Sequence, residues 1–585
     1  PGCKMFHKRK IVILFGSQTG TAQEVAEQAG REAERYLFEV KVSAMDNYPV
    51  EELVHERVVL FICSTTGQGE EPDNMKKFWR FLLQSRLPSN SLEEVKFGVI
   101  GLGDSSYPKY NFAAKKLRKR LLQLGGQQLM DIALGDDQHD LGPDAVVLPW
   151  LTEWWNAVLK LLPLPEGMTC IPKDVLLPPR IKVRTSRLHG CTSSRIPSGY
   201  LEGELISNCR VTSSDHFQDV RLLTIRVPGC RYSAGDVAVI QPGNLKENIT
   251  KFTELLQFDP SQSLVLEGSP NNDSCPYPQA LSSQECLEWY WDIQAVPKRY
   301  FFELLHHFSS SDLEKDKLLE LSSSEGQSDL YDYCYRPRRS IVETLDDFPN
   351  SRKFPLEYIF DLLPTIKPRS FSIASSPKSN PEILQLLVAV VKYKTRMHSP
   401  RLGLCSNWLA RLHSGDIVPI RTKKGTFVFP DPIKPFSPLI FVAPGTGIAP
   451  FRSFIRDVME CGCDNGQVHL FFGCRNKSKD YYFEDEWKEA ISLGFLTIYT
   501  AFSRDQDHKI YVQHKVEENS EILWKLINEM GAGIYIAGNA KDMPKCVQDS
   551  FKSIFERQGK LSAEESENYM RTLSVNFRLQ LETWS

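Results

Sequence analysis

Three apolar runs in the first third of the chain each end in a turn rich in glycine and hydroxyl residues, and an amphipathic stretch follows each turn. The runs cover residues 11–15, 58–63 and 97–101. Buried strands that alternate with helices in this way predict a parallel, doubly wound sheet. Ligands of such sheets bind beyond the carboxyl ends of the strands, so the three turns predict a single binding site.

Composition narrows the classes of function. The 585 residues predict several domains, and 41% hydrophobic with 24% charged residues is typical of a folded chain. A net charge of −3 gives no bulk positive field, so we expect no nucleic acid partner. The apolar runs are far shorter than the roughly 18 residues of a bilayer span, so we expect no membrane anchor. The 14 cysteines have no C-x-x-C spacing, which predicts no metal site and a cytoplasmic location.

Changes of pattern divide the chain into four parts. Residues 1–162 carry the first alternation of strands and helices, and a Pro-rich stretch at 163–199 predicts a hinge. Alternating segments within 200–435 predict an antiparallel barrel, interrupted by a helical insertion at about 245–360. Strands and helices alternate again within 436–585 and predict a second parallel sheet. The expected fold class is therefore multidomain, with two α/β domains and one β domain.

The turns of the first sheet suit a phosphate and a flat ring. The turn from Gly16 to Ala22 opens a helix, where backbone N–H groups and hydroxyls can face an anion. An ordinary capped helix start is the plain alternative for this turn. Two more polar, Gly-rich turns, at 64–70 and 101–107, are expected at the same sheet edge, and together they favour a pocket for a ring with a phosphate tail.

Motifs in the second half point to nucleotides. The segment 369–372 places an arginine on a predicted barrel strand, where it could pair with a pyrophosphate or simply pack in a core. Residues 442–451 form a strand, a Gly-rich turn and a helix, without the third glycine of the dinucleotide fingerprint. Arg504 and Lys509 suit a 2′-phosphate, although a solvated polar loop is the plain alternative. Two interpretations of Trp584 are open: it belongs to a frayed chain terminus, or its indole ring covers a flat ligand.

The order of these motifs, from Gly16 to Trp584, resembles the diflavin reductases. The resemblance implies a flavodoxin-like FMN domain, a hinge, an FAD-binding barrel and a ferredoxin-NADP reductase-like NADPH domain. It implies an NADPH-dependent oxidoreductase that passes electrons through FAD and FMN to a protein acceptor. Within the family, the chain is most similar to the branch of cytosolic iron–sulfur cluster assembly, whose acceptor is an iron–sulfur protein of the anamorsin type. The alternatives are a reductase of haem proteins, a reductase of methionine synthase, and a catalytically silent interaction scaffold.

The resemblance also implies site residues, carried over position by position. For FMN they are Ser17, Gln18, Thr19, Gly20, Thr21, Ala22, Ser64, Thr65, Thr66, Gly67, Leu102, Gly103, Asp104, Ser105, Ser106, Tyr107, Pro108, Lys109, Tyr110, Asn111 and Asp137. For FAD they are Arg338, Arg369, Ser370, Phe371, Ser372, Gly403, Leu404, Cys405, Ser406 and Trp584. For NADPH they are Thr446, Ser503, Arg504, Lys509, Ile510, Tyr511, Val512 and Gln513. Ser372, Glu582 and Trp584 would serve hydride transfer, and no metal ligand is assigned.

The chain departs from the family pattern at a few of its positions. Thr66 stands where P450 reductase-like members carry an aromatic residue, so one face of FMN would lack a stacking partner. Further departures are Phe371 for tyrosine, Ala537 for cysteine and Glu582 for aspartate. Acidic residues around the FMN turns, among them Glu70, Glu71, Asp73, Asp137 and Asp140, predict a basic patch on the acceptor.

Overall fold

The computed structural model describes residues 9–67, 69–107, 109–186, 196–268, 277–462 and 467–584. They form two compact units, each built from separate stretches of chain. The first unit consists of the described residues within 1–193, 244–367 and 395–399. The second unit consists of the described residues within 194–243, 368–394 and 400–585. The predicted insertion at about 245–360 therefore packs with the N-terminal part of the chain, although it interrupts the barrel in sequence.

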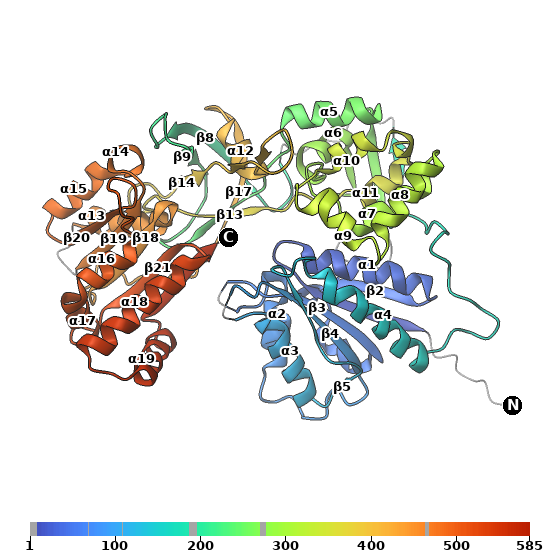
Figure 1. The fold of residues 1–585 in the computed structure, drawn as a ribbon, viewed down its shortest axis with the longest axis horizontal. Coiled ribbons are helices and arrows are strands. Elements are labelled where there is room, and N and C mark those ends of the chain that lie inside the picture. Colours follow the sequence, from blue (N-terminus) through green and yellow to red (C-terminus); the bar gives the residue numbers. More distant parts are fainter. Residues whose placement is uncertain are drawn as a thin grey trace. The chain divides into compact units, whose positions relative to one another are not determined.

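A parallel sheet with helices on both faces begins the first unit (Figure 1). Its elements are β1 (Lys10–Gly16), α1 (Thr21–Arg35), β2 (Glu39–Ala44), β3 (Val58–Ser64), α2 (Lys76–Leu82), β4 (Lys96–Gly103), α3 (Phe112–Gln123), β5 (Gln127–Gln128), β6 (Ala133–Asp136) and α4 (Asp144–Leu161). The strand order is β2-β1-β3-β4-β5, and β6 pairs with β4. Neighbouring residues of β1 face opposite sides, because Ile13 packs with α1 and α4 whereas Val12 packs with α2 and α3.

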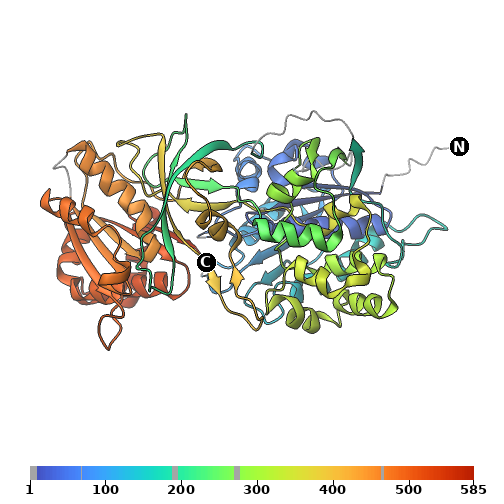
Figure 2. The ribbon, with the colours of Figure 1, turned by 90° about the horizontal axis from the view of Figure 1, so that it is seen from above.

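The remainder of the first unit is mainly helical and overlaps the α/β layer in the view of Figure 2. It belongs to the same compact unit as that layer. Its elements are β7 (Ile181–Ser186), α5 (Lys246–Leu256), β11 (Ser263–Gly268), β12 (Ala280–Ser282), α6 (Ser283–Glu285), α7 (Arg299–Leu305), α8 (Asp312–Ser322), α9 (Gln327–Leu330), α10 (Ile341–Asp347) and α11 (Ile359–Leu362). Trp291 and Phe302 are fully buried in its core. We call the described residues of 244–367 the helical part, and residues 9–162 the flavodoxin-like part.

The predicted hinge at 163–199 differs from a free connector. It contains β7, which pairs antiparallel with β11, because Ile181 and Val183 alternate into the core of the helical part. Before β7, two arginines of α1 donate hydrogen bonds to backbone carbonyl groups of the hinge. Arg31 donates to the oxygen of Pro178 at 2.7 Å, and Arg35 donates to that of Pro172 at 2.7 Å. The proline-rich segment is thus bound along α1.

An antiparallel barrel forms the first part of the second unit. Its elements are β8 (Leu201–Arg210), β9 (Val220–Arg226), β10 (Val237–Ile240), β13 (Arg369–Ser372), β14 (Ile383–Ala389), β15 (Lys392–Tyr393), β16 (Arg401–Leu402), α12 (Leu404–Ala410) and β17 (Ile417–Lys423). The main sheet runs β13-β10-β17-β8-β9-β14. A bridge between Ile373 and Leu386 joins its two edges and closes the barrel.

A second parallel sheet completes the chain, with helices on both faces (Figure 1). Its elements are β18 (Leu439–Pro444), α13 (Ala449–Cys461), β19 (Val468–Cys474), α14 (Lys477–Asp480), α15 (Glu484–Ser492), β20 (Leu496–Phe502), α16 (Val512–Glu518), α17 (Ser520–Asn528), β21 (Gly533–Asn539), α18 (Asp542–Gln558), α19 (Ala563–Val575) and β22 (Leu579–Trp584). The order β20-β19-β18-β21-β22 reverses direction between β18 and β21, which is the switch point of a doubly wound sheet. The predicted fold class is confirmed.

Candidate functional site

The loops after β1, β3, β4 and β6 meet at the carboxyl edge of the first sheet. The hydroxyl of Ser64 donates to the carbonyl of Gly16 at 3.4 Å, and the amide of Thr65 donates to the carbonyl of Leu102 at 3.1 Å. The amide of Asp137 donates to the carbonyl of Gly103 at 2.9 Å. The structure therefore brings together the turns in which the sequence places FMN.

The first turn is held in shape by its own side chains and by a neighbour. Gly20 precedes α1 with a left-handed φ of +101°, which favours glycine. Its amide donates to the hydroxyl of Ser17 at 2.9 Å, and the amide of Ser17 donates to Oδ1 of Asn74 at 2.8 Å. The Gln18 side chain bonds Asp73. Sequence reasoning missed Asn74, because its segment carries no phosphate-binding pattern.

Some predicted FMN residues have buried side chains. Ala22 and Leu102 lie in the sheet core, at 0% and 5% exposure. Asn111 is fully buried and donates to the carbonyl of Gly135 at 3.0 Å, so it fastens the loop after β4 to β6. These three residues can shape the site only through their backbone or by holding a loop. Pro108 lies outside the described residues.

The loop that carries Thr66 is a tight turn. The amide of Thr66 donates to the carbonyl of Glu70 at 3.0 Å, and the amide of Glu70 donates back at 2.8 Å. Thr66 and Tyr107 are both half-buried at the same sheet edge. The side chain of Lys109 covers Gly69, where an added Cβ would lie 2.7 Å from it.

The predicted FAD residues divide between the two units. Arg369 is exposed on β13. Burial raises the pKa of the Cys405 thiol to about 12, and the charge of Arg369 opposes this shift. Ser406 is buried, and its hydroxyl accepts from the amide of Val391 at 3.0 Å. Both segments, 369–372 and 403–406, belong to the second unit. Arg338 belongs to the first unit, where it is exposed with a φ of +57°.

A hydroxyl and a carboxyl pair at the end of β13. The hydroxyl of Ser372 donates to Oε1 of Glu582 at 2.6 Å. Burial raises the pKa of Glu582, although the Ser372 hydrogen bond opposes the shift. Its other oxygen, Oε2, is buried without a hydrogen-bond partner among the described residues. Trp584 ends β22 with 37% of its surface exposed, and its carbonyl accepts from the amide of Ala540 at 2.8 Å.

The Gly-rich turn at the switch point between β18 and β21 is closely packed. An added Cβ on Gly447 would lie 2.3 Å from the carbonyl oxygen of Ala537, so only glycine fits between β18 and β21. Thr446 is half-buried on the same turn. The missing third glycine of the fingerprint is replaced by Pro450, which lies buried in the first turn of α13.

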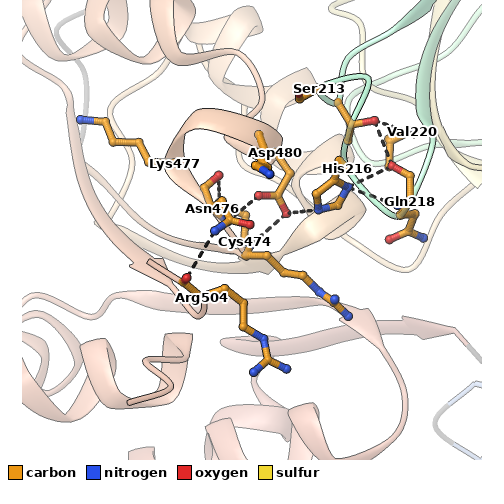
Figure 3. A network of polar contacts seen from close by, with 12 residues as sticks. Ser213, His216, Gln218, Val220, Cys474, Asn476, Lys477, Asp480 and Arg504 are labelled. Carbon is orange, nitrogen blue, oxygen red and sulfur yellow. Dashed lines mark hydrogen bonds and ion pairs between the residues drawn. The ribbon is translucent and has the colours of Figure 1, made fainter. Parts of the chain in front are cut away.

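The ends of β19 and β20 form a network that positions the predicted NADPH loop (Figure 3). The amide of Ser503 donates to the carbonyl of Cys474 at 3.0 Å, and the amide of Arg504 donates to that of Arg475 at 2.8 Å. Ser503 is buried, whereas the Arg504 side chain is exposed. Sequence reasoning missed Arg475, for which the only signal was its place directly after a buried strand.

A buried carboxylate supports this network. Asp480 accepts from the amides of Arg475 at 2.9 Å and Asn476 at 2.7 Å. Nε2 of His216, on the loop after β8, lies 3.6 Å from Oδ2 of Asp480 (Figure 3). The backbone of the same loop holds this turn from the barrel side, because the amide of Ser213 donates to the carbonyl of Lys479 at 2.9 Å.

The remaining side chains of the predicted NADPH loop, at 509–513, differ in how far they are exposed to solvent. Lys509 and Tyr511 are exposed, and Ile510 and Gln513 are half-buried. Val512 is buried in the sheet core, so its side chain is unable to face a ligand.

Comparisons with known proteins agree with this order of parts. Residues 13–150 match the flavodoxin family, residues 211–408 match the FAD binding domain, and residues 441–549 match the oxidoreductase NAD-binding domain. Proteins named NADPH-dependent diflavin oxidoreductase 1 are similar over the full length. The Xenopus laevis protein is 46% identical over 99% of this chain and 100% of its own length. The Danio rerio protein is 47% identical (98% and 99%), and the Schizosaccharomyces pombe protein is 37% identical (98% and 99%).

The chain belongs to the NADPH-dependent diflavin oxidoreductase family. As a diflavin oxidoreductase it is an enzyme that uses NADPH, FAD and FMN, and it passes electrons to a protein acceptor. The residues present fit these groups. Ser17, Thr19 and Thr21 bring hydroxyl groups to the start of α1, where the free amides of the first turn suit a phosphate. In the turn after β18, an added Cβ on Gly445 would meet no atom within 4 Å, so that turn is open at Gly445. No helix in the described ranges is long and apolar enough to cross a bilayer.

Proposed function

We propose that this diflavin oxidoreductase acts in the cytoplasm and reduces an iron–sulfur protein of the anamorsin type. Bound FAD would accept hydride from NADPH, and bound FMN would release the two electrons singly to two acceptor molecules. The similarity of the whole chain to diflavin oxidoreductases supports this order of transfer. Nine cysteines of the described residues, Cys461 aside, are free thiols, which fits a reducing compartment.

The side chains support distinct roles within this scheme. Ser17, Thr19 and Thr21 would hold the FMN phosphate at the start of α1. Ser372 and Glu582 would hold and orient a proton beside the flavin, since their oxygens lie 2.6 Å apart. Arg504 and Lys509, both exposed, would pair with the 2′-phosphate. Trp584 would cover the flavin face that nicotinamide must reach.

The observation that carries the acceptor proposal is the acidic edge of the flavodoxin-like part. Glu70, Asp137 and Asp140 are exposed at loops after β3 and β6. Glu71 is less available than the sequence suggests, because its side chain is only 14% exposed and pairs with Lys116. Complementary charge speeds the encounter of two proteins more than it tightens the complex. An acceptor with a basic patch would therefore meet this edge fastest.

Stopped-flow reduction of an anamorsin-type protein at low and high salt tests the proposal. The double variant Glu70→Lys with Asp140→Lys should slow acceptor reduction at least tenfold at low salt, while hydride transfer from NADPH stays unchanged. Glu153→Lys is the matched control, because Glu153 is exposed on α4, outside the four loops.

Three results would contradict the proposal. A rate indifferent to salt and to the reversals would remove the acidic edge from the mechanism. Efficient reduction of a P450 or of methionine synthase, but not of the iron–sulfur protein, would change the acceptor. A purified chain without yellow flavin absorption would favour the silent scaffold.

A further inference from the structure

A lysine of the helical part lies over the first turn of the flavodoxin-like part. Lys367 follows α11 and belongs to the same compact unit as α1. An added Cβ on Gly20 would lie 2.4 Å from Cε of Lys367 and 3.0 Å from its Nζ. The ammonium group is therefore within a few ångströms of the backbone at the start of α1, and only a glycine at position 20 lets it come so close.

Hydrogen bonds to two polar neighbours position the ammonium group of Lys367. Its Nζ donates to the hydroxyl of Thr365 at 2.9 Å and to Oε1 of Gln23 at 3.5 Å. Gln23 stands in the first turn of α1, so the second contact ties the ammonium to the end of the helix where the amides point. Lys367 also contributes, after Arg180, to lowering the pKa of Glu27 against the effect of burial.

Two further cations from outside the flavodoxin-like part face α1, and each has a carboxylate partner on that helix. Lys298 pairs with Glu24. Arg180, directly before β7, pairs with Glu27 at 2.5 Å and also with Asp361. Glu24 also stands in the first turn of α1, so Lys298 reaches the same end of the helix. Lys367 differs from both cations because its Cε and Nζ are among the atoms nearest an added Cβ on Gly20.

We propose that Lys367 is a counter-ion for the phosphate of FMN. The inference rests on the proposed placement of FMN at the start of α1. A phosphate monoester carries close to two negative charges at neutral pH, whereas a helix N-terminus supplies about half a positive charge. A lysine ammonium beside the turn adds a full charge and a charge-assisted hydrogen bond. The phosphate would then be shared by the flavodoxin-like part and the helical part.

Sharing the phosphate has a reciprocal consequence. If the packing of α1 against the helical part strengthens FMN binding, FMN strengthens that packing by the same factor. Riboflavin has the same ring without the phosphate, so it would bind without this coupling. The pairs Lys298–Glu24 and Arg180–Glu27 would keep α1 in place in either case.

Flavin titrations of the full-length, flavin-depleted chain test the proposal by fluorescence quenching. Lys367→Gln should weaken FMN about tenfold and leave riboflavin unchanged, and Lys367→Arg should restore most of the loss. The control Lys298→Gln removes a cation from the same interface but not from the turn, so it should not weaken FMN selectively. Salt should weaken FMN binding more steeply in the unsubstituted chain than in Lys367→Gln.

A second measurement follows the coupling. Hydrogen exchange at residues 171–180, which α1 binds through Arg31 and Arg35, should slow with FMN more than with riboflavin. In Lys367→Gln the two flavins should protect this segment equally.

Other outcomes overturn the inference in distinguishable ways. Equal FMN affinity in Lys367→Gln and the unsubstituted chain would overturn the role of Lys367 alone. An equal loss of FMN and riboflavin would reduce the lysine to a structural contact. Unchanged FMN binding after Ser17→Ala and Thr19→Ala would instead remove FMN from this turn, and the proposed function would lose its FMN site.

Discussion

Glu582 is a carboxyl whose environment favours its neutral form. Burial raises its pKa, and Oε2 is buried without a partner among the described residues. The folded chain thus holds this proton more tightly than the unfolded chain does. The stabilisation is complete below the ordinary carboxyl pKa of about 4.3 and is lost as the pH rises through the raised value.

Glu582→Gln, which stays neutral, should therefore gain in thermal stability relative to the unsubstituted chain as the pH rises from about 4.5 to 8. Melting temperatures of the two chains across this range provide the measurement. Glu564, which is exposed on α19, gives the control variant Glu564→Gln, whose difference from the unsubstituted chain should not vary with pH in this way. A pH-independent difference for Glu582→Gln would contradict the assignment.

The nucleotide preference of the enzyme is expected to depend on two residues, Arg504 and Lys509. Both are exposed in the loop between β20 and α16, so they can meet a 2′-phosphate without rearrangement of the core. Removing both charges should cost about 2 kcal/mol in kcat/KM for NADPH, roughly thirtyfold, and little for NADH. Lys477→Gln is the control, because its side chain points away from the network (Figure 3). Equal losses for both nucleotides would refute the 2′-phosphate site.

At the scale of elements, α1 links the two parts of the first unit. Arg180 lies between Glu27 of α1 and Asp361 of α11 and also donates to the carbonyl of Phe360. The side chain of Asp361 is 1% exposed, whereas those of Arg180 and Glu27 are 23% and 24% exposed. Leaving a buried charge without its partner typically costs about 3 to 5 kcal/mol, and the partial exposure of Arg180 places the expected cost towards the lower end of that range. Arg180→Gln should therefore lower the free energy of urea unfolding by roughly that amount, read by tryptophan fluorescence.

An exposed pair on the next strand is the matched control. Arg184 and Glu267 pair at 3.0 Å on β7 and β11, with 75% and 42% of their side chains exposed. Arg184→Gln should cost at most about 1 kcal/mol. Equal effects at the two arginines would mean that the cluster around Arg180 is not buried in solution.

The elements also show what the sequence could predict. The apolar runs at β1, β3, β18 and β19 predicted both parallel sheets, because buried strands of such sheets are continuously hydrophobic. Contacts between side chains that are far apart in the sequence could not be predicted. Asn74, Lys367 and the Glu71–Lys116 pair depend on residues that are distant along the chain. Strand β7 was not predicted, because the prolines of the segment that contains it favour a connector.

At the scale of the whole molecule, the two units differ in the ligands proposed for them. Ligands stabilise the unit that binds them, by about 2.7 kcal/mol at a hundredfold excess over Kd. In calorimetry, FMN should raise the transition of the unit that holds α1, and 2′,5′-ADP should raise that of the unit that holds Arg504. A single transition that both ligands raise equally would mean that the units unfold together.

The interleaving of the units also sets an order for synthesis on the ribosome. Strand β10 ends at Ile240, yet its two partners β13 and β17 begin at Arg369 and Ile417. At about 5 to 20 residues per second, the roughly 130 residues between β10 and β13 take about 6 to 26 seconds to be synthesised before the first partner emerges. During that interval the nascent barrel exposes unpaired strand edges, whereas the helical part is free to fold onto the completed flavodoxin-like part. The chain is therefore expected to need chaperone protection for its middle third, and slower translation across 240–369 should increase aggregation of the barrel.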